Sequence, residues 1–440
     1  MKKIILLLFA VYFTSFKFYS MSLISSDSLL EKATLQNCVQ YALRHQPLMK
    51  QSRLNEEITG YQIRSKLADW FPQLNFNYNL QHNYLLPTSN FQGNTIKVGL
   101  NNTSSGQFSL TQTIFNRDVL LAASTAGEVR NQAKQISVNN KINVVVNVSK
   151  AFYAVLFTQQ QNNLLDEDII RLKQSYEDAY NQYKGGVVDK TDYEQAEIAL
   201  NNAEAEKKQN EELLKANYAN LKDQMGYPSD SDLSLLYNIT TMENEVSIDT
   251  SEALNYDKRI EYKLLQTQYH LDQANLKYYE WSFLPSLNAF AEYNFNYQNN
   301  DLPKLYNQNY PNSYVGLQLS FPIFQGGKRI QEIGQAKLEL ERSGYDIVSL
   351  KNSMNAQYVQ SMSNYKSNLN NYIIMKKNLE LAKDVYNTIE LQYKSGVKTY
   401  LDVITAESNL RTTEVNLINA LYQTLSSKLD VQKALGTIQY

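Results

Sequence analysis

Four runs of this chain alternate between apolar and polar residues, which is the pattern of a β-strand with one buried face. They lie near residues 74–81, 108–111, 287–296 and 315–321. The other face is mostly uncharged asparagine, serine and glutamine, and Phe290 interrupts it. Polar, turn-rich stretches around 85–105 and 298–313 predict loops between the strand partners. The apolar positions are Leu74, Phe76, Tyr78, Leu80, Phe108, Leu110, Leu287, Ala289, Ala291, Tyr293, Phe295, Val315, Leu317, Leu319 and Phe321.

Each pair of strands is followed by apolar residues spaced alternately four and three apart. This 3.5-residue period is typical of a coiled-coil seam. Proline is absent from 88–227 and from 323–440, so very long helices are allowed, and one over about 118–182 would be roughly 95 Å long. Gly185-Gly186 and Ser395-Gly396 predict turns into returning helices, so each half contains a long helical hairpin. The seams are Leu165, Ile169, Leu172, Tyr176, Ala179 and Tyr183, then Met375, Leu379, Ala382, Tyr386, Ile389 and Tyr393.

The chain repeats itself at an offset of about 210 residues. Gln182-Tyr183-Lys184-Gly185-Gly186-Val187 returns as Gln392-Tyr393-Lys394-Ser395-Gly396-Val397, and Gly226 returns as Gly436. Further anchors occur in the same order, and such ordered self-similarity indicates duplication. We expect a first structural repeat over 23–227, a polar linker over 228–255 whose path stays open, and a second repeat over 256–440.

The N-terminus has the features of a secretory signal peptide, which we place at residues 1–22. Lys2 and Lys3 precede a ten-residue apolar segment that is too short to span a bilayer. No later apolar run reaches the length of a membrane helix, so the exported chain is soluble, secreted or inserted as a barrel. The net charge of −2 and the lack of a basic stripe argue against nucleic-acid binding. Cys38, the single cysteine, is expected to be a small buried apolar residue.

The strands leave two alternatives. One is a soluble antiparallel sheet with a solvated face, in a periplasmic or surface coiled-coil scaffold without channel activity. The other is an outer-membrane barrel with its apolar face toward lipid and its polar face toward a wet lumen. Four strands cannot close a barrel, and open edges are not tolerated in lipid, so the second alternative requires several copies of the chain.

No group of residues suggests catalysis, a cofactor or a metal site. His45, His82 and His270 lie far apart, without cysteine or carboxylate ligands at metal spacing. No phosphate-binding glycine loop or nucleophile motif occurs. Asp166-Glu167-Asp168 is interpreted as a solvated helix face. The sequence therefore predicts a protein that is not an enzyme.

The order of these elements resembles the TolC family of outer-membrane efflux proteins. The most specific fragments are Phe321-Pro322-Ile323-Phe324-Gln325-Gly326-Gly327 and Tyr393-Lys394-Ser395-Gly396-Val397 followed by Asp402. The resemblance covers about residues 35–436. It implies a mainly α fold with a β-barrel contribution: a homotrimer whose duplicated strand pairs form one twelve-stranded barrel in outer-membrane lipid, with an α-helical periplasmic tunnel. It also implies a passive exit channel that works with a periplasmic adaptor and an inner-membrane transporter.

The same resemblance implies that polar side chains at the hairpin tips hold the periplasmic entrance closed. By motif match these are Thr191 and Asp192 at the first tip and Tyr393 and Lys398 at the second. A charge-assisted contact between Lys398 and Asp192 is expected. The alternative is that all four are ordinary polar residues near a turn.

Asp402 falls where the family places an acidic residue that lines the constriction, and three copies would favour cations. A second acidic residue one turn later is replaced by Thr405. Asp402 could instead be a carboxylate that stabilises a helix start. Gly186-Val187 and Gly396-Val397 match the exposed tips that meet the adaptor, although plain turn chemistry also explains these glycines.

Overall fold

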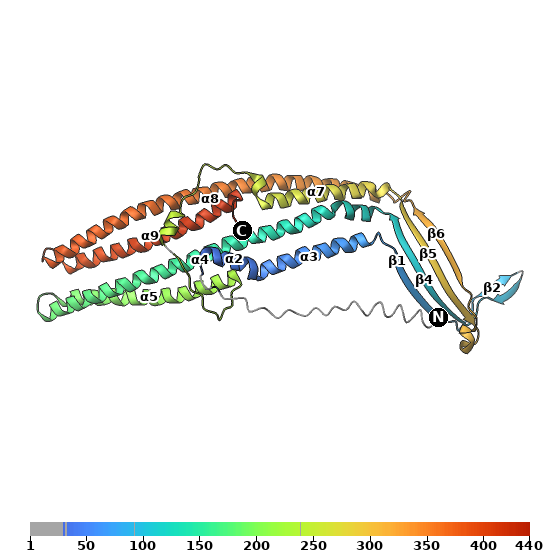
Figure 1. Cartoon of the computed structure of the whole chain (residues 1–440), viewed down its shortest axis with the longest axis horizontal. Helices are drawn as coiled ribbons and strands as arrows, with labels where there is room; N and C mark the ends of the chain where they lie inside the picture. Colours follow the sequence, from blue (N-terminus) through green and yellow to red (C-terminus); the bar gives the residue numbers. More distant parts are fainter. Residues whose placement is uncertain (1–29, 31–32, 92, 238) are drawn as a thin grey trace.

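The computed structural model describes residues 30, 33–91, 93–237 and 239–440. The molecule is elongated, with long helices toward one end and a β-sheet at the other (Figure 1). In the part that the structure describes, no helix is both long enough and apolar enough to cross a membrane. The predicted signal peptide over 1–22 lies outside the described residues.

The first half of the chain contains two short helices, a strand pair and a long helical hairpin. An additional small hairpin, β2–β3, connects the two long strands. The elements are α2 (Leu35–His45), α3 (Pro47–Ala68), β1 (Gln73–His82), β2 (Thr88–Phe91), β3 (Asn94–Lys97), β4 (Asn102–Phe115), α4 (Arg117–Lys184) and α5 (Lys190–Met225).

The second half repeats this order after a connecting segment, so the predicted duplication of strand pair and helical hairpin is confirmed. Its elements are α6 (Ile239–Asn244), η2 (Tyr256–Lys258), α7 (Ile260–Glu280), η3 (Trp281–Phe283), β5 (Ser286–Asn299), η4 (Leu302–Asn307), β6 (Asn312–Ser320), α8 (Lys328–Lys394) and α9 (Tyr400–Leu435).

The main sheet has the order β1-β4-β5-β6, and every neighbouring pair is antiparallel. The pairing of β4 with β5 joins the two halves of the chain. Across the sheet Phe76 is opposite Phe108, which is opposite Tyr293, so the apolar positions of neighbouring strands share one face. The sheet therefore has an apolar and a polar face, and β1 and β6 are its two edges.

The expected loop over 85–105 is wrong in two respects. β4 already begins at Asn102, and β2 and β3 form a hairpin within the stretch. These two strands have only four residues each, which is too short for an alternating pattern to stand out from a polar loop. Gly93, with φ +84°, lies in their turn. Likewise, the stretch 298–313 contains the end of β5, the short helix η4 and the first residues of β6.

The two long helices α4 and α8 have 68 and 67 residues, which corresponds to about 100 Å each at 1.5 Å per residue. The absence of proline lets them run without a break. Leu165, Leu172 and Ala179, seven residues apart on α4, are buried. This spacing confirms the predicted coiled-coil seam on α4.

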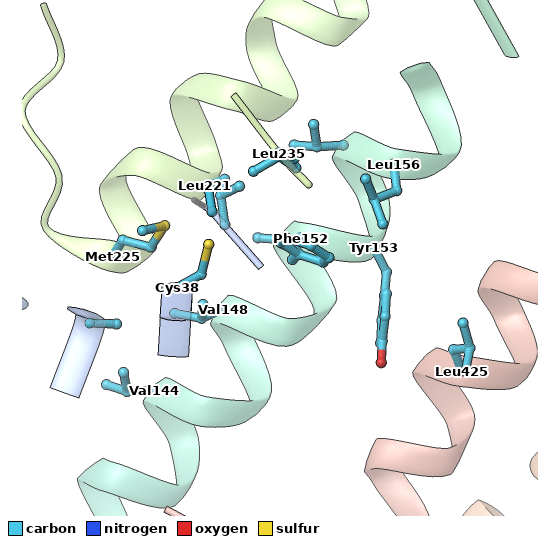
Figure 2. Close-up of a cluster of buried hydrophobic side chains, with 14 of the residues drawn as sticks. Cys38, Val144, Val148, Phe152, Tyr153, Leu156, Leu221, Met225, Leu235 and Leu425 are labelled. Carbon is cyan, nitrogen blue, oxygen red and sulfur yellow. The ribbon is translucent and has the colours of Figure 1, made fainter. Parts of the chain in front are cut away.

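Cys38 lies in the largest cluster of buried apolar side chains, between Val148 of α4 and Leu221 and Met225 of α5 (Figure 2). Burial raises the pKa of its thiol to about 12. This cysteine is therefore an unreactive packing residue, as the sequence predicts. Leu235, in the segment between the repeats, belongs to the same cluster.

The connecting segment packs on the helices at this level. Ala33 and Leu235 form a parallel bridge, and the Tyr365 hydroxyl donates a hydrogen bond of 2.8 Å to the carbonyl oxygen of Val246. Buried Leu235 and Val246 hold the segment against the long helices. The polar linker of the sequence therefore follows a defined path over its described residues.

Candidate functional site

The two hairpin tips have the same backbone structure. At the first tip, Val187 N–H donates to the carbonyl of Gln182 and Gly186 N–H to that of Tyr183, at 2.9 and 3.0 Å. This is the Schellman arrangement, which needs a left-handed residue after the helix. Gly186 has φ +72°. A Cβ on this glycine would meet nothing within 4 Å, so backbone conformation and not space requires it.

The second tip repeats these bonds, with Val397 donating to Gln392 and Gly396 to Tyr393, both at 2.9 Å. Gly396 has φ +77°. The two valines at the tips, Val187 and Val397, are 75% and 73% exposed. Each tip therefore presents one apolar side chain to its surroundings on a turn of defined shape.

Tyr393, a predicted gate residue of the second tip, contacts residues of both hairpins. The Tyr393 hydroxyl donates to Oε1 of Gln182 at 3.2 Å, which joins α8 to α4. The Tyr393 ring also contacts buried Tyr400 with a centroid separation of 5.9 Å. Tyr400 packs with Ala179 and Ala196, so helices from both hairpins meet here.

Lys398 has a different partner from the one that the sequence suggests. Its Nζ lies 3.5 Å from Oδ1 of Asp402, four residues along the same chain. Among the described residues of one chain, no ion pair joins Lys398 to Asp192. Thr191 is exposed and Asp192 half-buried in the first turn of α5. A contact between Lys398 and Asp192 would have to form between neighbouring copies.

Asp402 is part of a capping box at the start of α9. Thr399 N–H donates to Oδ2 of Asp402 at 3.0 Å, and Asp402 N–H donates to the Thr399 hydroxyl oxygen at 3.3 Å. Such reciprocal bonds satisfy backbone donors at a helix start. Hydrogen bonds from the Thr399 backbone and side chain, together with nearby Lys398, lower the pKa of Asp402. The anionic form of the side chain is therefore favoured, and the same carboxylate caps the N-terminus of α9.

The sequence does not predict a cluster of buried charges that lies between α4 and α9, away from the hairpin tips. Asp168 is 1% exposed, so the interpretation of Asp166-Glu167-Asp168 as a solvated face is wrong for Asp168. Its place three residues after Leu165 and four before Leu172 puts it on the buried seam. Arg171 forms an ion pair with Asp168, and Arg411 of α9 lies 3.3 Å from it.

The cluster joins three helices. Glu407 of α9, 3% exposed, accepts a bond of 3.4 Å from Nε of Arg171. Arg411 also lies 3.6 Å from Glu206 of α5. Asp168, Glu407 and Arg411 line a pocket of about 160 Å³ between these helices. Burial raises the pKa of both Asp168 and Glu407 against the opposing effect of the arginines.

The histidines occupy separate places. His45 stacks on Tyr41 at 4.1 Å between ring centroids, and Nδ1 of His82 lies 2.6 Å from Oδ1 of Asn102. His270 is exposed on α7. Within the ranges that the structure describes, no group of three or more histidine, cysteine or acidic side chains has the geometry to hold a metal.

Comparisons with known proteins agree with this architecture. The family model described as outer membrane efflux protein matches residues 38–227 and 261–437. Outer membrane protein TolC of Salmonella enteritidis is 23% identical over 95% of this chain and 85% of its own length. The alkaline protease secretion protein AprF of Pseudomonas aeruginosa is 23% identical over 64% of this chain and 59% of its own length.

Among solved structures, the outer membrane protein VceC of Vibrio cholerae superposes with a TM-score of 0.74 at 14% identity. The match covers 91% of this chain and 96% of VceC, which shows a common fold. The two segments of the family match contain both strand pairs and both helical hairpins. The chain therefore belongs to the outer membrane efflux protein family and is an outer-membrane exit channel.

Proposed function

We propose that three copies of this chain form one passive duct, with a twelve-stranded barrel in the outer membrane and a helical tunnel in the periplasm. The observation that carries this proposal is the four-stranded sheet, whose edges β1 and β6 have no partner strand in the sheet of one chain. In lipid each unpaired backbone group would cost several kcal/mol. Because β1 and β6 run antiparallel, β6 of one copy can continue into β1 of the next.

The helices support the same assembly. On α8 the apolar side chains of Leu338, Tyr345, Val348 and Val359 are exposed. Their spacings of 7, 3 and 11 residues fit a 3.5-residue period, so they lie along one stripe. Such a stripe on a long helix is stabilised when a neighbouring helix covers it. The adjacent copies of a trimer would supply that helix.

We infer that the hairpin tips form the periplasmic gate and the docking surface. Thr191, Asp192, Tyr393 and Lys398 would connect neighbouring helices in the closed state, and Asp402 would line the constriction. Gly186-Val187 and Gly396-Val397 would contact the periplasmic adaptor, since their exposed valines offer small apolar contacts on defined turns. The contact of Tyr393 with Gln182 supports this placement.

The cargo would reach the duct from an inner-membrane transporter through the adaptor. The family description as efflux protein favours small molecules, and the relative named as a protease secretion protein favours an exported protein. In either case the duct itself needs no nucleophile and no cofactor. Specificity for the cargo would then come mainly from the pump and the adaptor.

Fractionation of cells and conductance measurements test this function. We expect the chain in the outer-membrane fraction as a trimer that resists detergent until heated, and we expect discrete conductance steps when it is added to planar bilayers. Recovery in the soluble periplasmic fraction, or a membrane protein without conductance, would contradict the duct. Soluble recovery would instead favour a coiled-coil scaffold.

A further inference from the structure

The polar face of the sheet contains one acidic side chain. Glu292 is the only aspartate, glutamate, lysine or arginine in β1, β4, β5 and β6. It is the seventh of the fourteen residues of β5, so it lies halfway along the strand. Its cross-strand partners are Ser109 of β4 and Tyr314 of β6. An ionised side chain at this depth is costly in lipid, which places this face toward the lumen.

Neighbouring side chains hold the carboxylate of Glu292 in place. Nε2 of Gln107 donates to its Oε2 at 2.5 Å, and the Tyr314 hydroxyl donates to the same oxygen. Both hydrogen bonds use Oε2, and this leaves Oε1 for a further partner. Glu292 is therefore a fixed acceptor on the wall and not a freely rotating side chain.

Two aromatic rings lie beside this carboxylate on the same face. Phe290 and Tyr314 meet edge to face, with ring centroids 6.1 Å apart and an interplanar angle of 77°. Phe290 is the residue that interrupts the polar pattern of the strand. Its ring lies across Gly316, where an added Cβ would come within 2.7 Å of Cζ. Glycine at this position thus makes room for an aromatic surface next to the acid.

We propose that Glu292, Phe290 and Tyr314 form a binding site for organic cations on the barrel wall, midway through the membrane. The ligand class is an amine or quaternary ammonium ion attached to an aromatic or aliphatic body. The carboxylate supplies the opposite charge, and the ring faces attract a cation and cover its apolar part. This inference rests on the proposed trimeric barrel, in which the site occurs three times around the bore.

The site is separate from the proposed gate. The sheet and the hairpin tips lie at opposite ends of the molecule (Figure 1), so Asp402 and Glu292 would be met in sequence by a cation that crosses the duct. A cation added from the side of the β2–β3 hairpin reaches the barrel first. Block from that side therefore reports on Glu292 before it reports on the tips.

Block of single channels by benzyltrimethylammonium, compared with tetramethylammonium, tests the proposal. We expect benzyltrimethylammonium to block the native channel at lower concentration and in a voltage-dependent manner. Glu292→Gln keeps the shape of the side chain and should raise the half-blocking concentration about fivefold, because the opposite charge is lost. Phe290→Leu should raise it about threefold for benzyltrimethylammonium, whose benzyl ring loses an aromatic partner, and less for tetramethylammonium, which loses only the attraction of one ring face. If Glu292→Gln fails to assemble, Phe290→Leu still tests the site.

Asp301→Asn is the matched control, because Asp301 follows the end of β5 and its ion pair with Lys304 lies outside the strands. It removes the same charge and should leave the block unchanged. Equal block in the native channel, Glu292→Gln and Phe290→Leu would overturn the site, as would an equal loss in Asp301→Asn. A native protein that forms no channels would overturn the proposed duct itself, which is a distinct result.

Discussion

The hydroxyl of Tyr393 lies 3.2 Å from Oε1 of Gln182, and this hydrogen bond joins the last turns of α8 and α4. The two residues come from equivalent fragments of the two repeats, Gln182-Tyr183 and Gln392-Tyr393. The duplicated motif thus supplies both sides of one contact between the hairpins. This contact can hold the ends of α4 and α8 at the hairpin tips together.

Removal of this hydroxyl tests its part in closure. Tyr393→Phe keeps the ring against Tyr400 and loses one hydrogen bond, which contributes about 1 kcal/mol. We expect a higher single-channel conductance in planar bilayers and unchanged trimer assembly. Tyr183→Phe, at the equivalent place in the first repeat, is the control and should behave as the native channel does. Equal conductance in both variants would remove Tyr393 from the gate.

The proposed contact between Lys398 and Asp192 can be tested from both sides. Lys398→Ala and Asp192→Ala should each raise the conductance if these residues meet across neighbouring copies. Lys394→Ala is a suitable control, because Lys394 is the last residue of α8 and pairs with Glu390 of its own helix. If both test variants conduct as the native channel does, the gate assignment of these two residues is wrong.

Asp402 should control ion selectivity at the tips. Asp402→Asn is expected to move the reversal potential in a potassium chloride gradient toward zero, because three negative charges leave the constriction. Because its pKa is lowered, Asp402 keeps its charge to a lower pH than an ordinary aspartate does. Native selectivity should therefore persist under mild acid and fade only as the pH falls through that lowered pKa.

Thr405 replaces a second acidic residue of the family pattern, so restoring an acid at this position is the reverse experiment. Thr405 lies three residues after Asp402, which is about one helical turn. Thr405→Asp would add a second ring of acids and should make the native channel more selective for cations, with stronger block by divalent ions. An unchanged reversal potential in both variants would show that Asp402 and position 405 do not face the ion path.

The buried carboxyl groups of Asp168 and Glu407 predict how the stability of the fold changes with pH. Burial, and for Glu407 also nearby Asp168, raises the carboxyl pKa in the folded protein. The folded state then holds more protons than the unfolded state between the usual and the raised pKa, so stability falls as pH rises through that window. Glu407→Gln should unfold at a higher temperature than the native protein at pH 7.5.

This difference should shrink as the pH is lowered through the raised pKa of Glu407, because the native side chain then becomes neutral, as the glutamine already is. Unfolding followed by circular dichroism in detergent measures it. Glu197→Gln is the matched control, since Glu197 occupies the equivalent place on α5 and is exposed. A stabilising effect of Glu407→Gln that does not change with pH, or the same effect in Glu197→Gln, would contradict the assigned cause.

Much of the fold could be predicted from local patterns. The alternation of apolar and polar residues predicts the four strands of the main sheet. The 3.5-residue period and the absence of proline predict the long helices. Gly226 and Gly436, which the repeat places at equivalent positions, follow the ends of α5 and α9 and have left-handed backbone with φ +64° and +73°. These features are encoded within a few residues of each other, so a sequence is enough to locate them.

The buried charges could not be located in this way. Glu197 and Glu407 are the same residue type at equivalent places in the repeat, yet only Glu407 is buried. Glu407 is buried where it meets Arg171 of α4, which lies 236 positions away in the chain. For Asp168 a signal was available, because it falls on the seam between Leu165 and Leu172. Because Asp168 belongs to a run of three acidic residues, the run as a whole is interpreted as a solvated face.

The mass of the purified particle tests the central claim most directly. Light scattering of the outer-membrane protein in detergent, corrected for bound detergent, should give three copies of the mature chain, and mild heating should convert this particle to single chains. A single folded chain that remains stable after transfer to lipid would contradict the account, because β1 and β6 would then be unpaired edges in the membrane.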